Sequence, residues 1–149
     1  MAITQAMATS FKVEILTAFH NFGTTAVRAG TGADTFKIAM YTSSATLSAA
    51  TTAYSSSNEV SGTGYTAGGN TLTISQVPTS TSTTAWLDFS DTTWSTATIT
   101  ANGALIYNST QSNRAVAVLA FGGDKTSTAG DFTIVFPAAD STNAIIRIA

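Results

Sequence analysis

The chain has 149 residues, a net charge of −2 and no cysteine. A chain of this length is expected to form one domain with its own core, and the lack of cysteine excludes disulfides and thiolate metal sites. Charged residues make up 9% of the chain, against about 25% in an average protein, while serine and threonine approach a third. The few, scattered basic residues argue against a nucleic-acid partner, which requires clustered positive charge.

The N-terminal region has the pattern of neither a signal peptide nor a membrane span. Its most apolar part, FKVEIL, contains Lys12 and Glu14, whereas the apolar region of a signal peptide is uninterrupted. No stretch reaches the ~18 consecutive apolar residues that cross a bilayer. We therefore expect a protein that is made in a cytoplasm and has no membrane partner.

Residues 5–20 are expected to form an amphipathic helix. Apolar side chains recur there at steps of three and four, including Met7, Phe11 and Ile15, and Gly23 stands where a helix could end. The apolar face of this helix either packs on the core of its own chain or docks on a neighbouring subunit.

Beyond Gly32 the apolar residues alternate with polar ones, which is the period of a β-strand. The segments are rich in Val, Ile, Thr, Phe and Tyr and are separated by clusters of turn residues, a pattern typical of antiparallel sandwiches and barrels. The expected strands cover residues 36–41, 72–75, 85–89, 98–107, 114–121, 132–136 and 144–148. The sequence thus predicts a single all-β domain over residues 1–149, an antiparallel β-sandwich or jelly-roll-like barrel with one N-terminal helix.

A long polar loop is predicted over residues 42–64, which contain too few apolar residues for a core strand. Loops longer than about 15 residues inside a compact domain usually serve a function or are ordered by a neighbour. The alternative interpretation is a polar segment that is simply disordered.

The strand period places Trp86 on the same outer face as Asp88. A tryptophan on an outer face is either covered by a loop of its own chain or exposed for a partner. Tryptophan is enriched at protein interfaces, so Trp86 is a candidate contact residue.

The glycine-rich stretch VSGTGYTAGGNTLT does not predict a phosphate-binding loop. Such a loop leads from a strand into a helix whose backbone N–H groups point at the phosphate, but the residues after Gly69 have the strand period. Gly68 and Gly69 are better explained as a tight turn with positive φ angles that joins two antiparallel strands.

No catalytic, cofactor or metal site is predicted. His20 is the only histidine. A histidine-rich metal site therefore cannot form, and a Ser-His-Asp triad would depend on this one residue. Asp88 and Asp91 suggest the carboxylate pair of a glycosidase, but Asp91 opens a turn, where aspartate is favoured. Asp124 and Asp131 bracket GGDKTSTAGD, which is either a weak Ca²⁺ loop or a plain hairpin loop. We expect a protein that is not an enzyme and uses no cofactor.

Several longer blocks resemble a known family. They include DTFKIAMYTSSATL, EVSGTGYTAGGNTLT and AVAVLAFGGDKTSTAGDFTIVFPAADSTNAIIRIA, within a similarity from about Ser10 to Ala149. These blocks are similar to small virion structural proteins of tailed bacteriophages. The resemblance implies a protein located in the virion, with no catalytic residues to carry over. It implies a capsid decoration (cement) protein or, alternatively, a tail, neck or fibre component that contacts host-surface glycan.

A cement protein binds across the joints between capsid subunits, so that many symmetric, modest contacts strengthen the shell. The expected partners are the major capsid protein or other virion proteins, and the chain is expected to form homo-oligomers. The candidate contact residues are bulky side chains on the helix, in the polar loop and at the two tryptophans: Phe11, Ile15, Leu47, Tyr54, Trp86 and Trp94. In the glycan alternative, the aromatic rings that stack on sugars are Trp86, Trp94, Tyr54 and Tyr65.

Overall fold

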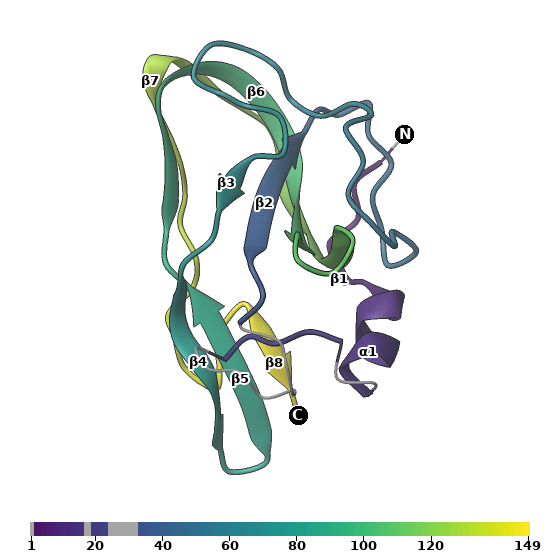
Figure 1. The fold of residues 1–149 in the computed structure, drawn as a ribbon. Coiled ribbons are helices and arrows are strands. Elements are labelled where there is room, and N and C mark those ends of the chain that lie inside the picture. The colour runs from purple at the N-terminus through teal and green to yellow at the C-terminus, as the bar shows by residue number, and fades with distance from the viewer. Residues whose placement is uncertain (1, 17–18, 24–32) are drawn as a thin grey trace.

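The computed structural model describes residues 2–16, 19–23 and 33–149. Within them the chain is mainly β, with two antiparallel sheets packed together as a sandwich (Figure 1), which confirms the predicted fold class. The larger sheet has five strands in the order β1-β7-β6-β2-β3, and the smaller has three in the order β4-β5-β8. The elements are β1 (Ala6–Met7), α1 (Thr9–Leu16), β2 (Phe36–Tyr41), β3 (Asn70–Thr71), β4 (Ile74–Thr81), β5 (Thr84–Phe89), β6 (Thr92–Asn108), β7 (Arg114–Ile134) and β8 (Ile146–Ile148).

Strands β6 and β7 form one long ribbon that arches over β2 and β3 (Figure 1). Register shifts interrupt their pairing at several points, and two non-glycine residues in the ribbon, Thr96 and Ala129, have φ angles of 52° and 48°. Such irregularities bend a strand and increase its twist. The bends allow one end of the ribbon to form part of the large sheet, while its other end lies beside the small sheet.

Aromatic rings join the two sheets. Phe36 of β2 stacks on Phe22 with 4.1 Å between ring centroids, and it lies 6.1 Å from Phe89 of β5. Phe89 in turn lies 5.8 Å from Phe136. All four side chains are buried, and burying each contributes roughly 2 kcal/mol to stability. This row of rings is the core between the layers.

The N-terminal helix is shorter than the predicted helix over residues 5–20. α1 covers only Thr9–Leu16, because the residues before it pair with β7 as strand β1. Residues 17 and 18 lie outside the described residues, and residues 19–23 are not helical. Within the described part of the chain, no helix has the length and apolar character that crossing a membrane requires.

Strand prediction succeeded for β2, whose bounds match the predicted residues 36–41. It failed for β7, which unites the two strands expected at 114–121 and 132–136. The GGDKTSTAGD block between them is therefore paired strand and not the predicted hairpin loop. Most side chains of this block are exposed or half-exposed, so no apolar period of two marks it in the sequence.

Residues 42–64 form the long loop that the sequence predicts, and the loop is ordered against the large sheet. Isolated bridges join Ala53 to Arg114 and Thr63 to Thr98. These bridges link the loop to both strands of the β6–β7 ribbon, which favours a loop held in place over a simply disordered polar segment.

Candidate partner-binding site

The structure divides the six predicted contact residues into two groups. Three are sealed in the core of this chain: Phe11, Leu47 and Trp94. Their assignment as partner contacts is corrected, because a side chain that is covered by its own fold cannot reach another protein. Three remain partly exposed: Ile15, Tyr54 and Trp86.

Aromatic packing explains why the bulkiest candidates are buried. Phe11 lies edge-on to His20 and to Phe22, with 4.8 Å and 5.9 Å between ring centroids. Trp94 stacks beside Tyr65 at 5.9 Å. Since rings in this geometry gain both buried area and favourable electrostatic contact, these side chains stabilise the core of the monomer.

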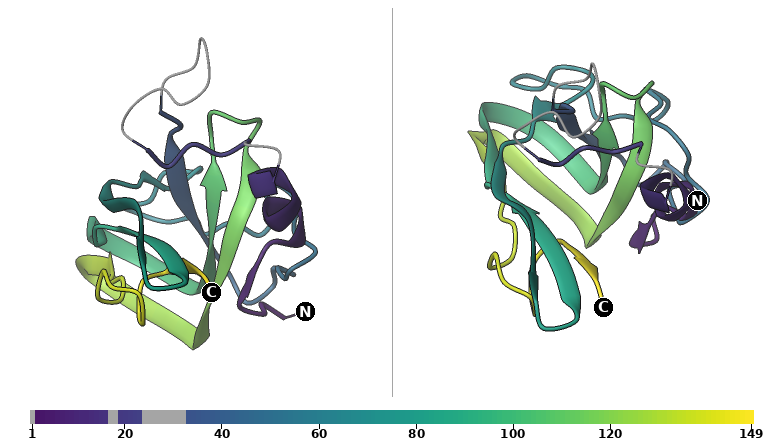
Figure 2. Two further views of the ribbon diagram at one scale, coloured as in Figure 1. Left: turned by 90° about the horizontal axis from the view of Figure 1, so that it is seen from below. Right: turned by 60° about the horizontal axis from the view of Figure 1, so that its bottom comes forward.

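Ile15 and Trp86 line one apolar groove between α1 and the small sheet. Its volume is about 170 Å³, and other lining residues include Phe22, Leu87 and Ile148. Ile148 is 48% exposed, and no lining residue carries a permanent charge. Figure 2 shows α1 and the small sheet standing apart at this face, with residues 19–23 crossing between them. An apolar cavity of ~150 Å³ holds a benzene molecule, so this groove fits one large apolar side chain of a partner.

Trp86 and Asp88 do not share an exposed face as the strand period predicts. Trp86 is partly exposed, with its Nε1 3.4 Å from Thr81 Oγ1, whereas Asp88 is fully buried. The last residues of β5 are covered on both faces of the strand. The alternation of side chains along the strand therefore does not distinguish buried from exposed residues there. The backbone N–H of Phe89 donates to Asp88 Oδ1 at 2.8 Å, and Oδ2 has no hydrogen bond within 3.5 Å. Burial raises the pKa of Asp88, and the nearby backbone N–H groups offset only part of this rise.

A cluster around Glu59, which sequence reasoning missed, fixes the long loop. Glu59 Oε2 accepts a hydrogen bond from the Tyr54 hydroxyl at 2.7 Å. Glu59 Oε1 accepts two more, from the Tyr65 hydroxyl and the Gly68 backbone N–H, both at 2.7 Å. Hydrogen bonds to a charged acceptor are short and about twice as strong as neutral ones. One carboxylate of the loop therefore binds Tyr54 within the loop and two groups just after it, Tyr65 and Gly68.

The remaining two tyrosines of the chain extend this cluster to the sheet. The Tyr107 hydroxyl donates to the Gly68 carbonyl at 2.8 Å, and its ring stacks on Tyr54 at 4.7 Å. The Tyr41 hydroxyl donates to the Ser55 carbonyl at 2.6 Å. Burial raises the pKa of all four tyrosines, so each hydroxyl stays a neutral donor. The only sequence signal was the concentration of Tyr and Glu in a stretch otherwise rich in Ser and Thr.

The glycine turn next to this cluster is confirmed in part. Gly68 and Gly69 have φ angles of 90° and 67°, and the Gly69 N–H donates to the Thr66 carbonyl at 3.0 Å. A Cβ at Gly69 would collide with the carbonyl group of Ile38, whose carbon would lie 2.7 Å away. The turn leads into β3, which pairs antiparallel with the preceding strand β2. The long loop over residues 42–64 separates β2 from the turn, so the turn does not join the two strands directly.

His20 has a structural place in the fold. Its Nδ1 lies 3.0 Å from Asn108 Nδ2, and the same amide donates to Asp34 Oδ2 at 2.8 Å. Asn108 Oδ1 accepts the backbone N–H groups of Thr110 and Gln111, which fixes the orientation of the amide. The imidazole therefore accepts at Nδ1 and links residues 19–23 to the end of β6.

The acidic residues singled out in the sequence bind separate partners. Asp91 Oδ1 accepts the Phe136 backbone N–H at 2.8 Å and not the local turn bond that the sequence suggests. Asp124 and Asp131 are each hydrogen-bonded to β6, at 2.7 Å and 3.2 Å. In the described part of the chain, no group of three or more His, Cys, Asp or Glu residues is placed to hold a metal ion.

Comparison of the chain with protein-family models, curated proteins and solved structures found no match. The resemblance to small virion proteins of tailed bacteriophages therefore stays a prediction.

Proposed function

We propose that this chain is a structural protein of a tailed-bacteriophage particle, a capsid decoration (cement) protein that binds across the joints between capsid subunits. The observation that carries the proposal is the apolar groove lined by Ile15 and Trp86, on a chain with few charges and many hydroxyl groups. An apolar surface left open on an otherwise polar exterior favours contact with another protein.

The ordered loop supports the same role. A protein that joins subunits needs a fixed surface, and the hydrogen bonds of Glu59 hold the loop in place within the monomer. A preorganised surface loses little conformational entropy on binding. Neighbouring copies of the chain and the major capsid protein are the expected partners, and modest contacts repeated with the symmetry of the shell add up to a strong attachment.

The copy number of the chain in purified virions tests this proposal. Quantitative mass spectrometry of particles whose genome encodes this sequence should find it at a level comparable to the major capsid protein. A copy number far below that of the shell would place the chain in the tail, neck or fibres. Absence of the chain from the particle overturns the proposal.

Groove variants test the contact surface itself. Trp86→Ala should lower the occupancy of the chain on particles about tenfold, as expected for a central aromatic contact. Val77→Ser is the matched control, because Val77 is 37% exposed but does not line the groove. Equal occupancy of the two variants would contradict a role for the groove.

The alternative, a tail, neck or fibre component that contacts host glycan, has less support. Of the four aromatic side chains that would stack on sugar, Trp94 is buried, and Tyr54 and Tyr65 are hydrogen-bonded to Glu59. Trp86 alone lies outside these contacts. We expect no binding on a glycan array, and binding that Trp86→Ala abolishes would favour this alternative.

A further inference from the structure

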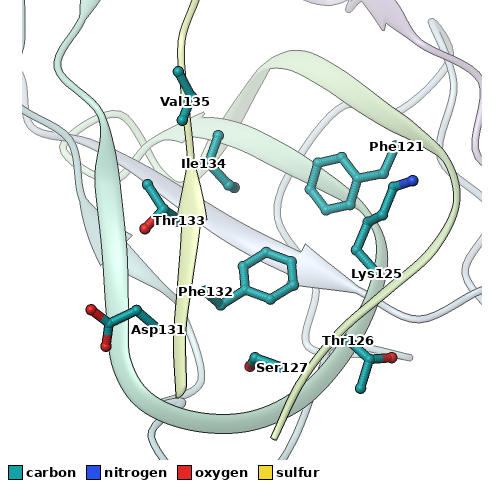
Figure 3. A pocket seen from close by; sticks show the side chains of 9 residues that line it. All are labelled: Phe121, Lys125, Thr126, Ser127, Asp131, Phe132, Thr133, Ile134 and Val135. Carbon is teal, nitrogen blue, oxygen red and sulfur yellow. The ribbon is translucent and has the colours of Figure 1, made fainter.

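Strand β7 bends around a hollow of about 440 Å³ (Figure 3). The FGGDKTSTAGDF block begins with Phe121 and ends with Phe132, and the two rings meet across the bend with 6.4 Å between centroids. Figure 3 shows both rings turned toward each other from the two arms of the strand. The volume lies within the usual range of about 300–1,000 Å³ for binding pockets.

A bulge in β7 builds this bend. The register shifts opposite Ala101 and Gly103 of β6, and the facing part of β7 contains Gly122 and Gly123 with φ angles of 71° and 139°. A Cβ at either glycine would meet nothing within 4 Å. The two glycines are thus needed for their backbone conformation and not for space, and they set the shape of the hollow.

Two charged residues line the hollow, the cation Lys125 and the anion Asp131. Lys125 lines it beside Phe121, while Asp131 and Thr133 point to the other side of the strand (Figure 3). Asp124 and Asp131 are hydrogen-bonded to groups of β6, and no salt bridge joins either carboxylate to Lys125 within the described residues. The Lys125 ammonium is therefore available to an incoming carboxylate.

An apolar surface formed by Phe121, Phe132, Ile134 and Val135 lines part of the hollow and lies along an open strand edge. Val135 is 72% exposed, and Phe132 and Ile134 form the floor. Within the described residues, this part of β7 pairs only with β6, since β1 reaches no further than Val118. An extended segment can add to such an edge through backbone hydrogen bonds while its side chains fill adjacent pockets.

We propose that this hollow docks an extended segment of another protein of the particle, in which an acidic side chain stands beside a large apolar one. The carboxylate binds the Lys125 Nζ, and the apolar side chain enters between Phe121 and Val135. Charge complementarity favours the acidic residue, because Lys125 is the only cation among the described residues that line the hollow and its side chain is exposed. The inference rests on the proposed function and adds the chemistry of the partner.

Carbodiimide coupling of intact particles tests the pairing directly, since it joins an amine to a carboxylate that is in contact with it. Mass spectrometry should find an amide between Lys125 and an Asp or Glu that neighbours a large apolar residue in a different particle protein. A cross-link from Lys125 to a second copy of this chain overturns the proposal. The absence of a Lys125 cross-link in particles that contain the chain also overturns it.

Charge reversal gives a second measurement. Lys125→Glu should lower the occupancy of the chain on particles about tenfold, through repulsion of the partner carboxylate. Lys125→Arg keeps the positive charge at the same position and should leave occupancy unchanged. Both variants should melt like the wild type, because surface substitutions change stability little. Equal occupancy overturns the docking site and leaves the proposed function standing, whereas absence of the wild-type chain from particles overturns both.

Discussion

The long loop and the groove use their residues in opposite ways. The loop is polar in sequence, yet its Tyr54 and Glu59 side chains, and those of Tyr41 and Tyr65 at its two ends, are occupied by contacts within the chain. The groove between α1 and the small sheet is apolar in sequence, yet Ile148 and Trp86 remain partly exposed there. The comparison shows that internal contacts, more than residue type, decide which side chains a partner can reach.

The largest expected effect is a loss of stability at alkaline pH, caused by the four tyrosines in and around the long loop. Burial raises the pKa of all four above the ordinary value of 10.0. The unfolded chain loses these protons near pH 10 while the folded chain keeps them. The free energy of unfolding is therefore unaffected below pH 10 and falls above it, by roughly 1.4 kcal/mol per pH unit for each fully protected tyrosine.

This predicts that phenolate absorbance appears in a single step. That step should coincide with the loss of the far-ultraviolet circular dichroism of the β-sheets. A gradual rise of phenolate absorbance near pH 10, with the fold intact, would show that the tyrosines are not protected.

The next largest effect is expected at Gly69. Gly69→Ala places a methyl group against the Ile38 carbonyl and should lower the free energy of unfolding by about 4 kcal/mol or more. Gly122→Ala is the matched control, because Gly122 also has a positive φ but has open space around it. The control should lose only about 1 kcal/mol from the left-handed backbone. Urea denaturation of the two variants separates the collision from the backbone cost, and equal losses would refute the close approach.

Removal of the Glu59 carboxylate should have a somewhat smaller effect. Glu59→Ala leaves two tyrosine hydroxyls and one backbone N–H without their acceptor, and we expect a loss of about 3 kcal/mol. Asp124→Asn changes an exposed carboxylate with one hydrogen bond and should cost about 0.5 kcal/mol or less. Limited proteolysis should cut Glu59→Ala within residues 42–69 first. A variant as resistant as the wild type would show that Glu59 does not fix the loop.

The smallest effect is expected at Asp88 on the small-sheet side. Since burial raises the pKa of Asp88, the folded state holds this proton more tightly than the unfolded state. Stability is therefore highest below the ordinary carboxyl pKa of about 3.9 and falls as the pH rises toward the folded-state value. Asp88→Asn should flatten this fall in thermal melts between pH 4 and 8, and Asp124→Asn should not. A slope that Asp88→Asn leaves unchanged would assign the pH dependence elsewhere.

The sequence by itself determined the all-β class, the bounds of β2 and the positive φ angles of Gly68 and Gly69. These features depend on residues close in the chain. A period of two follows from the alternation of side chains along one strand, and a positive φ follows from the absence of a Cβ at one residue. The sequence also placed Ile15 and Trp86 among the candidate contact residues, but it did not predict that they line one groove.

Tertiary structure alone decided which of these side chains are covered. Phe11 and Trp94 are bulky enough for an interface, yet rings from other segments of the chain cover them in the core. The strand period places Asp88 on an outer face, yet other parts of the chain cover both faces of its strand at this position. The Glu59 cluster and the bend of β7 likewise need partners from β2 and β6. Whether a side chain is buried depends on which other segments of the chain pack against it. The periodicity of one segment does not show which segment will cover its face.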